Sequence, residues 1–414
     1  MSAFTIPLSG LAAESDALNV IANNLANLNT DGYKDQNVSF SDIFNQLQGV
    51  SGNGDPIQVG SGVQVGAIVS NYTDGTPTST GIDSNMALQG NGFFAVENAG
   101  DSQMSFTRAG NFTVNEQGQL ATADGQLVLG YPAVDGKIST SAALAPIDVN
   151  QQNTIPGVAT TSFQMTTNLD AGAATGATLS SPITVYDSLG NTHTLTVQYA
   201  KTGTNTWSYS LSVPSADVGG TGATTQVASG TLTFDSSGNL LTPQSPVSGI
   251  KIAGLADGAA DMNVSWDLTG SGGSAILTQQ AATSGTASTS QNGYGVGTLT
   301  GYSVLPDGTV QGQFSNNQTL ALGQVAVASF ANVQGLQQLG SGNLEATAAS
   351  GAAVIGTAEA GGNGNIIGGS VEDSNVSLST EFSNMIVAQQ GYEANAKVLT
   401  TMDQVVQATI QLIT

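Results

Sequence analysis

The sequence predicts a mainly β protein with an α-helix at each end of the chain. The C-terminal stretch 374–414 has no proline and a single glycine, Gly391, in a protein of 414 residues that contains 53 glycines. All prolines except Pro7 lie in the interior, from Pro56 to Pro306. Near both termini apolar residues recur every three or four positions, whereas in the interior they alternate with polar residues between turn residues. These observations favour helical ends around a β-rich interior.

The first helix is predicted within residues 1–30, and Ser9 or Gly10 is its expected start. The run from Asn29 to Gly32 is expected to end it, because glycine accepts the positive φ of a helix C-terminus. The apolar stripe of this helix has the a and d spacing of a coiled-coil seam. It consists of Leu11, Leu18, Ile21, Leu25 and Leu28.

Four asparagines crowd the polar face of the first helix and its end: Asn23, Asn24, Asn27 and Asn29. Asparagine is a poor helix former, so helix propensity does not explain them. Two interpretations stay open. The face is either solvated and used for capping, or it packs against neighbouring chains through amide hydrogen bonds.

The second helix is predicted within residues 374–414, with its apolar residues on one stripe. Two amphipathic helices at opposite ends of a chain are expected to meet and to form one coiled-coil assembly domain from residues 1–30 and 374–414. The residues predicted to carry subunit assembly are Leu11, Leu18, Ile21, Asn24, Leu25 and Leu28 from the first helix, and Leu378, Phe382, Met385, Tyr392, Leu399, Met402, Val406 and Ile413 from the second.

A single contact between these two helices leaves one face of each helix exposed, so it buries too little apolar surface to order both. We therefore predict that both ends are disordered in the free monomer. They become ordered when several subunits enclose every helix.

The interior divides into three predicted parts. Residues 31–74 are an extended connector with a short helix from Ser41 to Leu47. Residues 75–146 and 289–373 form an inner β-domain, and residues 147–288 form an outer β-domain inserted in it. Turn residues between alternating strands predict hairpins at Asp187–Asn191, at Asp235–Asn239 and at Pro306-Asp307-Gly308.

Composition excludes several classes of function. The net charge is −23 and only six residues are basic, so nucleic acid and anionic membranes are not expected partners. No apolar run is long enough for a membrane span, and no cleaved signal peptide is visible. Cysteine is absent, which removes disulfides and thiolate chemistry.

No catalytic, cofactor-binding or metal-binding residue is predicted, and the protein is not expected to be an enzyme. The sole histidine, His193, is expected at the surface or in a cross-strand pair, without a partner at triad or metal spacing. The sole arginine, Arg108, is expected in a surface or domain-internal salt bridge. The Asp-x-x-Gly-Asn turns lack the alternating acids and final glutamate of an EF-hand loop.

Two terminal blocks resemble the bacterial flagellar rod and hook axial proteins. The first runs from Ala17 through Asn27 and continues as Asn29-Thr30-Asp31-Gly32-Tyr33-Lys34. The second comprises residues 375–382 and 391–397, and it departs from the family pattern at Gln390 and Glu393. The Asp187–Asn191 turn with its flanking strands resembles the outer domain of hook proteins, which points to hook rather than rod.

This resemblance implies a homopolymer that forms a hollow, curved, bendable tube, a universal joint that transmits motor torque from rod to filament. It also implies rod, hook-cap and hook–filament junction proteins as partners. Export through the flagellar type III apparatus, unfolded and without a cleaved signal, would place the protein in the extracellular part of the flagellum. The alternatives are a distal-rod or junction relative, or, in a different class, a secreted surface adhesin.

Overall fold

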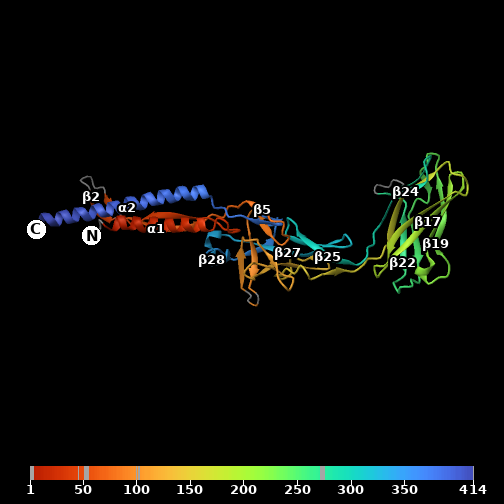
Figure 1. The fold of residues 1–414 in the computed structure, drawn as a ribbon, viewed down its shortest axis with the longest axis horizontal. Coiled ribbons are helices and arrows are strands. Elements are labelled where there is room, and N and C mark those ends of the chain that lie inside the picture. The colour runs from red at the N-terminus through yellow and green to blue at the C-terminus, as the bar shows by residue number, and fades with distance from the viewer. Residues whose placement is uncertain are drawn as a thin grey trace. The chain divides into compact units, whose positions relative to one another are not determined.

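The computed structural model describes residues 4–44, 46–50, 56–98, 100, 103–270 and 276–413. The chain divides into two compact units. The first unit contains Met1–Gln151, Gly301–Gly312 and Leu320–Thr414, and the second contains Gln152–Thr300 and Gln313–Thr319. The fold is mainly β with a helix near each terminus, which confirms the predicted fold class (Figure 1).

Helix α1 spans Thr5–Ala26 and helix α2 spans Leu378–Ile413. The expected start of α1 at Ser9 or Gly10 is wrong, because the helix begins four residues earlier and carries Pro7 in its first turn. Proline is tolerated there since the first N–H groups of a helix have no intrahelical acceptor.

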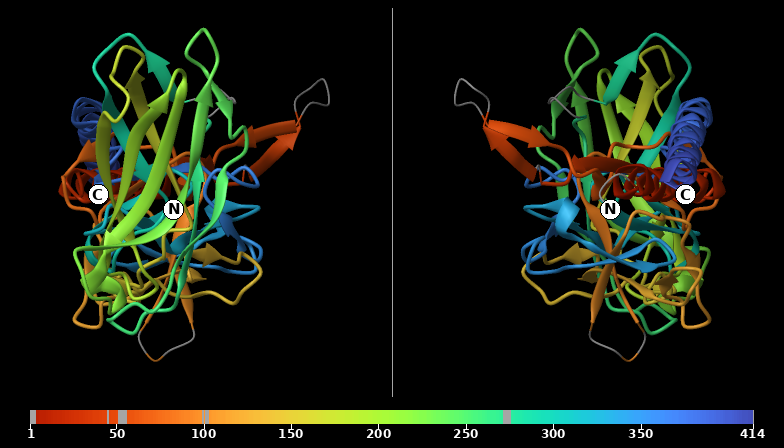
Figure 2. Two further views of the ribbon diagram at one scale, coloured as in Figure 1. Left: turned by 90° about the vertical axis from the view of Figure 1, so that its right-hand side faces the viewer. Right: turned by 90° about the vertical axis from the view of Figure 1, so that its left-hand side faces the viewer.

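The segment predicted as a connector forms two antiparallel ladders. β1 (Gln36–Asp42) pairs with β4 (Val63–Ser70), and β2 (Gln46–Val50) pairs with β3 (Pro56–Val59). Figure 2 shows the β2–β3 ladder standing out to the side of β1 and β4. The predicted helix from Ser41 to Leu47 is wrong: its described residues lie mostly in β1 and β2, because pairing with β4 and β3 satisfies backbone groups that so short a helix would leave open.

The main sheet of the first unit has the strand order β26-β27-β11-β7-β8-β29-β28. These strands are β26 (Thr309–Phe314), β27 (Thr319–Ser329), β11 (Leu127–Val134), β7 (Phe93–Glu97), β8 (Met104–Thr107), β29 (Asn343–Glu345) and β28 (Gln337–Gly340). Shorter strands join it at β11 and β27, directly or through one another: β9 (Thr113–Val114), β10 (Leu120–Ala121), β12 (Lys137–Ile138), β13 (Ala145–Pro146) and β30 (Val354–Thr357). A short 3-10 helix, η2, spans Val333–Gly335.

Two small ladders hold the chain that leads into α2. β5 (Pro77–Ser79) pairs with β32 (Ser370–Glu372), and β6 (Met86–Gln89) pairs with β31 (Asn365–Gly368). The aromatic core of the sheet lies nearby, where Phe93 and Phe106 meet Phe330 edge to face at ring distances of 5.9 and 4.8 Å. Edge-to-face contact is a preferred geometry for aromatic pairs, so these rings stabilise the core of the sheet.

The second unit is a sandwich of two sheets around one core (Figure 1). One sheet has the order β16-β17-β18-β19-β20, and the other has β21-β22-β15-β23 with β24 on β15. The strands are β15 (Ser162–Asp170), β16 (Thr178–Tyr186), β17 (Thr192–Gly203), β18 (Thr206–Pro214), β19 (Thr224–Phe234), β20 (Leu240–Thr242), β21 (Val247–Ile252), β22 (Met262–Asp267), β23 (Leu277–Gln280) and β24 (Gly285–Gln291), with the 3-10 helix η1 at Ser215–Val218. β14 (Thr154–Ile155) pairs with β25 (Gly297–Val304), outside the two sheets of the sandwich.

Period-two alternation decides which side chains fill this sandwich. Along β17 every second residue is buried, from His193 to Lys201. Trp207 and Trp266 are at most 1% exposed, and Trp266 stacks on Phe163. The hairpins predicted at Asp187–Asn191 and Asp235–Asn239 are confirmed, because β16 pairs with β17 and β19 pairs with β20 across these turns.

Candidate assembly surface

Helices α1 and α2 pack antiparallel across a stripe of small side chains. Ala13 and Ala17 of α1 and Ala388 of α2 are buried at this contact. A Cβ atom on Gly10 would lie 2.7 Å from Asn395 Nδ2, and one on Gly391 would lie 2.5 Å from Glu14 Oε1. The two backbones therefore approach closely. The prediction missed this stripe, although the three-residue and four-residue steps from position 10 to 13 and 17 are a readable signal.

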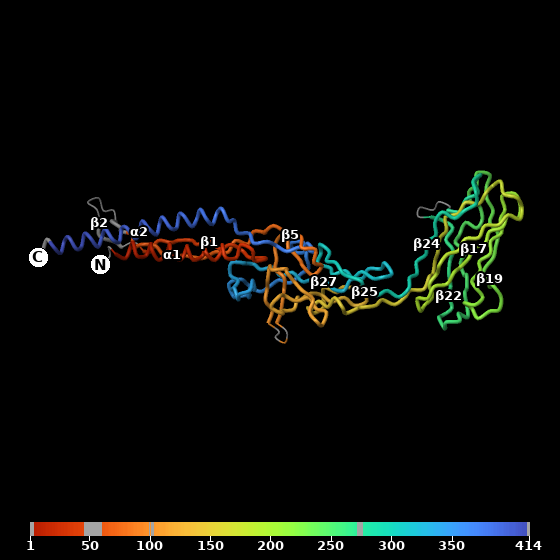
Figure 3. The backbone as a smooth tube through the Cα atoms, in the orientation of Figure 1, coloured from red at the N-terminus to blue at the C-terminus, as the bar shows by residue number. Residues whose placement is uncertain are grey.

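The contacts between the helices also set the register of α2 against α1, and so show where α2 passes the start of α1. Asn24 faces Glu381 and Gly10 faces Asn395, so by the same register Thr5 lies near Thr400. α2 continues past that point to Ile413 (Figure 3). Its last three turns therefore run beyond the described start of α1.

The predicted assembly residues of α1 fall into three groups. Ile21 and Asn24 are buried. Leu18 and Leu25 are half-buried and pack on the cluster of Ala17, Ile21 and Ala388, together with Val38 of β1 and Met385 of α2. Leu11 and Leu28 are also half-buried but lie outside that cluster, and Leu28 follows the end of α1 rather than lying in it.

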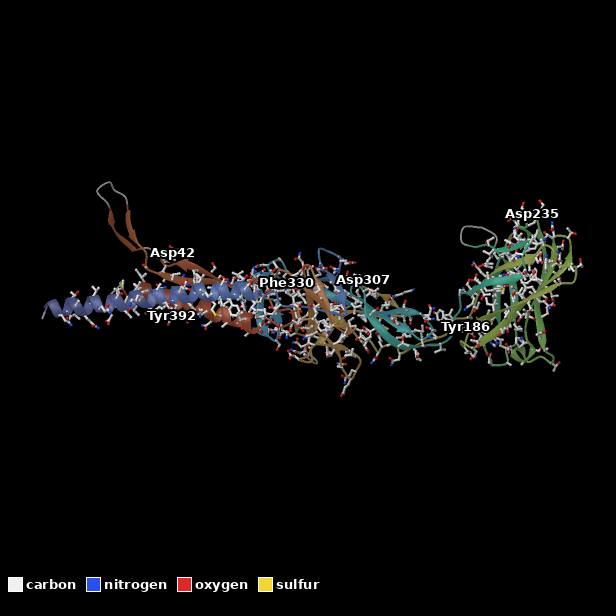
Figure 4. All side chains as sticks on the ribbon, turned by 45° about the horizontal axis from the view of Figure 1, so that its top comes forward. Asp42, Tyr186, Asp235, Asp307, Phe330 and Tyr392 are labelled. Atoms are coloured by element: carbon white, nitrogen blue, oxygen red, sulfur yellow. The ribbon has the colours of Figure 1, made fainter. Side chains whose placement is uncertain are left out.

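The predicted assembly residues of α2 differ in exposure. Met385, Leu399 and Met402 are half-buried, whereas Leu378, Phe382, Tyr392 and Val406 are between 42% and 49% exposed. Figure 4 labels Tyr392 on the helix. The side chain of Ile413 lies outside the described part of the chain. Further large apolar side chains are exposed on the same helix: Ile386, Val387, Val398, Val405 and Ile410.

A groove of about 310 Å³ lies where α1, α2 and β1 meet. Val38 and Phe40 of β1 and Val387 of α2 contribute apolar walls, and Phe40 is 44% exposed. Glu14 and Glu381 supply carboxylates at its lining. The groove can therefore receive an apolar side chain beside a polar group.

Asn24 binds within its own chain. It is fully buried, and its side-chain Nδ2 donates to Gln36 O at 2.8 Å and to Glu381 Oε2 at 3.3 Å. Its Oδ1 accepts from Gln36 N at 3.0 Å and from Tyr33 Oη at 3.1 Å. Its side chain is therefore not solvated, because α1, β1 and α2 surround it.

A buried ionic network ties the base of both helices to the β-sheet. Lys34 Nζ lies 2.6 Å from Glu372 Oε1, and Arg108 Nη1 lies 3.4 Å from Glu372 Oε2. Burial lowers the pKa of Lys34, and its hydrogen bond to Glu372 opposes that effect. The domain-internal salt bridge predicted for Arg108 is confirmed.

His193 is buried on β17 opposite Val185 of β16, which confirms the cross-strand alternative and not the surface one, and the structure adds partners that no triad or metal spacing in the sequence indicated. Its side chain is 7% exposed, and three aspartates surround its ring. The sequence did not indicate this cluster, because Asp257 lies in a loop more than sixty residues after His193.

Among the residues that the structure describes, neither helix is both long and apolar enough to cross a membrane.

Family models of flagellar proteins match the chain in four places. The flagella basal body rod protein model matches residues 6–34, and the flagellar hook protein FlgE/F/G D1 domain model matches residues 87–204. The flagellar basal body protein FlaE D2 domain model matches residues 159–294. The flagellar basal body rod FlgEFG protein C-terminal model matches residues 367–412.

Full-length relatives agree with these matches. The chain is 34% identical to the flagellar hook protein FlgE of Escherichia coli K12, over 99% of this chain and 100% of that protein. It is 35% identical to FlgE of Salmonella typhimurium, over 99% of each, and 30% identical to FlgE of Treponema pallidum, over 98% of each. The crystal structure of Helicobacter pylori flagellar hook protein FlgE2 is similar in fold, with a TM-score of 0.50, 15% identity, and coverage of 70% of this chain and 98% of that one.

Proposed function

The chain belongs to the flagellar hook protein FlgE family and is a structural subunit of the flagellar hook, and from this premise we propose that its paired terminal helices are the surface on which copies assemble. The single observation that supports the proposal is the exposed apolar face of α2. Val387, Val405 and Ile386 are 68%, 60% and 55% exposed. An exposed apolar surface of this kind is typical of a protein–protein contact.

The occupant of this face is a second copy of the chain. The groove between α1, α2 and β1, which includes Val387, presents apolar walls, and the exposed apolar side chains of α2 outside the groove, such as Val405, fit such walls in another copy. These two surfaces differ, so the contact is heterologous, and it repeats without closing where the rotation between copies is not that of a ring. An open helical filament follows from that geometry.

The remaining steps of the proposal come from membership in the family. The assembled tube is hollow and curved, bends as it rotates, and transmits torque between rod and filament. The rod, the hook cap and the hook–filament junction bind its ends, and the type III export apparatus delivers the chain unfolded. The predicted assembly residues contribute with both their half-buried and their exposed side chains.

Val387→Asp tests the assembly surface. Val387 is exposed, so the monomer keeps its fold, whereas burying a carboxylate at a copy–copy contact is costly. We expect the critical concentration for polymerisation, measured by sedimentation and electron microscopy, to rise at least tenfold.

Val134→Asp is the matched control, since Val134 of β11 is 70% exposed and lies in a strand rather than in either helix. It should polymerise like the unchanged chain. Normal polymerisation of Val387→Asp would show that this face of α2 stays open in the polymer, and the proposal would be abandoned.

A further inference from the structure

Four titratable side chains converge at one place in the second unit. Asp187 opens the turn between β16 and β17, and His193 is the second residue of β17. Asp217 belongs to η1, and Asp257 lies in the loop between β21 and β22. That loop is held in place by two hydrogen bonds, from Ala256 N to Asp217 O at 2.8 Å and from Ala260 N to Ser188 Oγ at 3.0 Å.

The distances around one ring nitrogen match a coordination polyhedron. His193 Nε2 lies 3.2 Å from Asp187 Oδ2 and 3.5 Å from Asp257 Oδ2. Among the described residues, Asp187, His193 and Asp257 bring one ligand atom each within 4.8 Å of one another. Ligands about 2.0–2.1 Å from a tetrahedral ion are separated by roughly 3.3–3.4 Å. The two measured separations lie on either side of that value.

The second ring nitrogen of His193, Nδ1, has a carboxylate partner, as the second nitrogen of metal-binding histidines usually does. His193 Nδ1 lies 3.0 Å from Asp217 Oδ2 and Nε2 lies 3.2 Å from Asp187 Oδ2, so without an ion the ring can donate to both carboxylates, and with an ion at Nε2 its remaining proton stays on Nδ1 and donates to Asp217. This leaves the lone pair of Nε2 directed toward Asp187 and Asp257. A carboxylate on the second nitrogen orients metal-binding histidines and raises their basicity.

Asn191 holds the two carboxylates together. Its Nδ2 donates to Asp187 Oδ2 at 3.3 Å and to Asp257 Oδ2 at 3.0 Å. Each carboxylate oxygen has two lone pairs, so each can accept this bond and bind a cation as well. Asp187 is fully buried, whereas the side chain of Asp257 is 28% exposed. The site is therefore open to solvent on the Asp257 side, where an ion can enter and waters can complete its shell.

The charge of the cluster is unbalanced. Three carboxylates surround one imidazole, and the lysines of the second unit are engaged elsewhere. Lys201 Nζ donates to Ala171 O at 2.6 Å, and Lys251 Nζ pairs with Asp261 Oδ2 at 2.9 Å. Buried or half-buried carboxylates gathered at such short range favour an additional cation.

We propose that Asp187, His193 and Asp257 bind a divalent transition-type cation such as Zn²⁺, through Asp187 Oδ2, His193 Nε2 and Asp257 Oδ2, with Asp217 as the positioning residue for the imidazole. An imidazole nitrogen among the ligands favours this class over Ca²⁺ and Mg²⁺, which prefer oxygen alone. The ion joins the β16–β17 turn to the loop between β21 and β22. It therefore links one sheet of the sandwich to the other and stabilises the second unit.

The Asp235 turn is a built-in control. Asp235 Oδ1 accepts from Ser237 N at 2.8 Å and from Asn239 N at 2.9 Å, and Asn239 Nδ2 donates to Asp235 Oδ2 at 3.2 Å. Asp187 makes the corresponding bonds with Leu189 and Asn191. The two turns share their local geometry, and only the one at Asp187 has a histidine and a second aspartate beside it.

The test uses the dilute full-length chain after treatment with a chelator. Both tryptophans, Trp207 and Trp266, lie in the second unit, so their fluorescence reports the unfolding of that unit alone. We expect titration calorimetry to give one Zn²⁺ per chain and the fluorescence Tm to rise saturably with Zn²⁺. Co²⁺ should give the visible spectrum of a site with a nitrogen ligand, and equal concentrations of Ca²⁺ or Mg²⁺ should leave the Tm unchanged.

Asp257→Asn, at a half-buried position, should fold and bind Zn²⁺ at least tenfold more weakly, and His193→Gln should abolish binding. Asp235→Asn should bind like the unchanged chain. The proposal is overturned by the absence of a Zn²⁺-dependent Tm shift. His193 would then only connect Asp187 and Asp217 through hydrogen bonds. Zn²⁺ binding by His193→Gln as tight as that of the unchanged chain would overturn it too. So would weakening of binding by Asp235→Asn equal to that by Asp257→Asn, since either result would mean that Zn²⁺ binds acidic groups without a specific site.

Discussion

Helix α2 and the sandwich of the second unit use their apolar side chains in opposite ways. Among the described side chains of α2, nine large apolar ones are between 42% and 68% exposed. In the sandwich the largest side chains, Trp207, Trp266 and Tyr199, are at most 1% exposed. The sandwich meets its need for burial inside one chain because two sheets cover each other, whereas α1 covers only one narrow face of α2. In the second unit, burial of apolar surface stabilises the fold of one chain. In α2, much of the apolar surface stays exposed and is available for association.

Hydrogen exchange should reveal this contrast most strongly. In the dilute monomer we expect amides of α1 and α2 to exchange almost as fast as in an unfolded chain, since each helix retains an open apolar face. Amides of β17 and β18 exchange only on unfolding of the sandwich, so they should be protected by about a thousandfold or more. Mass spectrometry of peptides from the monomer and the polymer measures both. Equal protection of helices and sandwich in the monomer would contradict the prediction.

Trp266→Ala should damage the sandwich and spare the helices. Trp266 is fully buried, stacks on Phe163 and meets Tyr209 edge to face. Truncating a buried tryptophan costs about 3–5 kcal/mol of the free energy of unfolding. Urea unfolding followed by the fluorescence of Trp207 measures that cost. The exposed Leu189→Ala is the control, expected within about 0.5 kcal/mol of the unchanged chain.

Asn24→Ala tests whether the helix pair depends on its buried amide. The change leaves Gln36 N and Glu381 without their side-chain partner, at a cost of about 1–3 kcal/mol. Because helix ordering and assembly are coupled, we expect the critical concentration to rise roughly tenfold. Asn29→Ala, at an exposed position after α1, should have no effect. If both variants assemble alike, the hydrogen bonds of the Asn24 side chain contribute nothing to the stability of the ordered helix pair.

Alkaline pH should weaken the sandwich through Tyr199. Burial raises the pKa of its hydroxyl above the ordinary value of 10.0, against an opposing hydrogen bond with Thr167. The unfolded chain therefore loses this proton at lower pH than the folded one. Its contribution to stability is complete below pH 10 and is lost above it, by up to about 1.4 kcal/mol per pH unit. Tyr199→Phe should flatten the alkaline limb of the fluorescence-detected unfolding, and Tyr392→Phe in α2 should not.

Local signals predicted the elements whose partners are adjacent in the chain. The hairpins at Asp187 and Asp235 were predicted correctly because turn residues and period-two alternation are local. The helix predicted at Ser41 failed because the partner strand β4 is brought in from more than twenty residues away. The predicted stripe of Leu11, Leu18 and Leu25 leaves out Gly10, Ala13 and Ala17, because large side chains dominate a hydrophobic pattern, whereas close backbone approach requires small ones.

The sequence by itself determined the secondary-structure class of each region and the family, because composition, periodicity and the terminal blocks are local features of the chain. Only the tertiary structure decided which face of α2 meets α1, that Asn24 is held within one chain, and that His193 lies among three aspartates. Each of these depends on segments far apart in sequence, and side-chain chemistry is set by neighbours in space. A lone histidine between threonines carries no sign of Asp257 until two sheets bring the turn and the loop together.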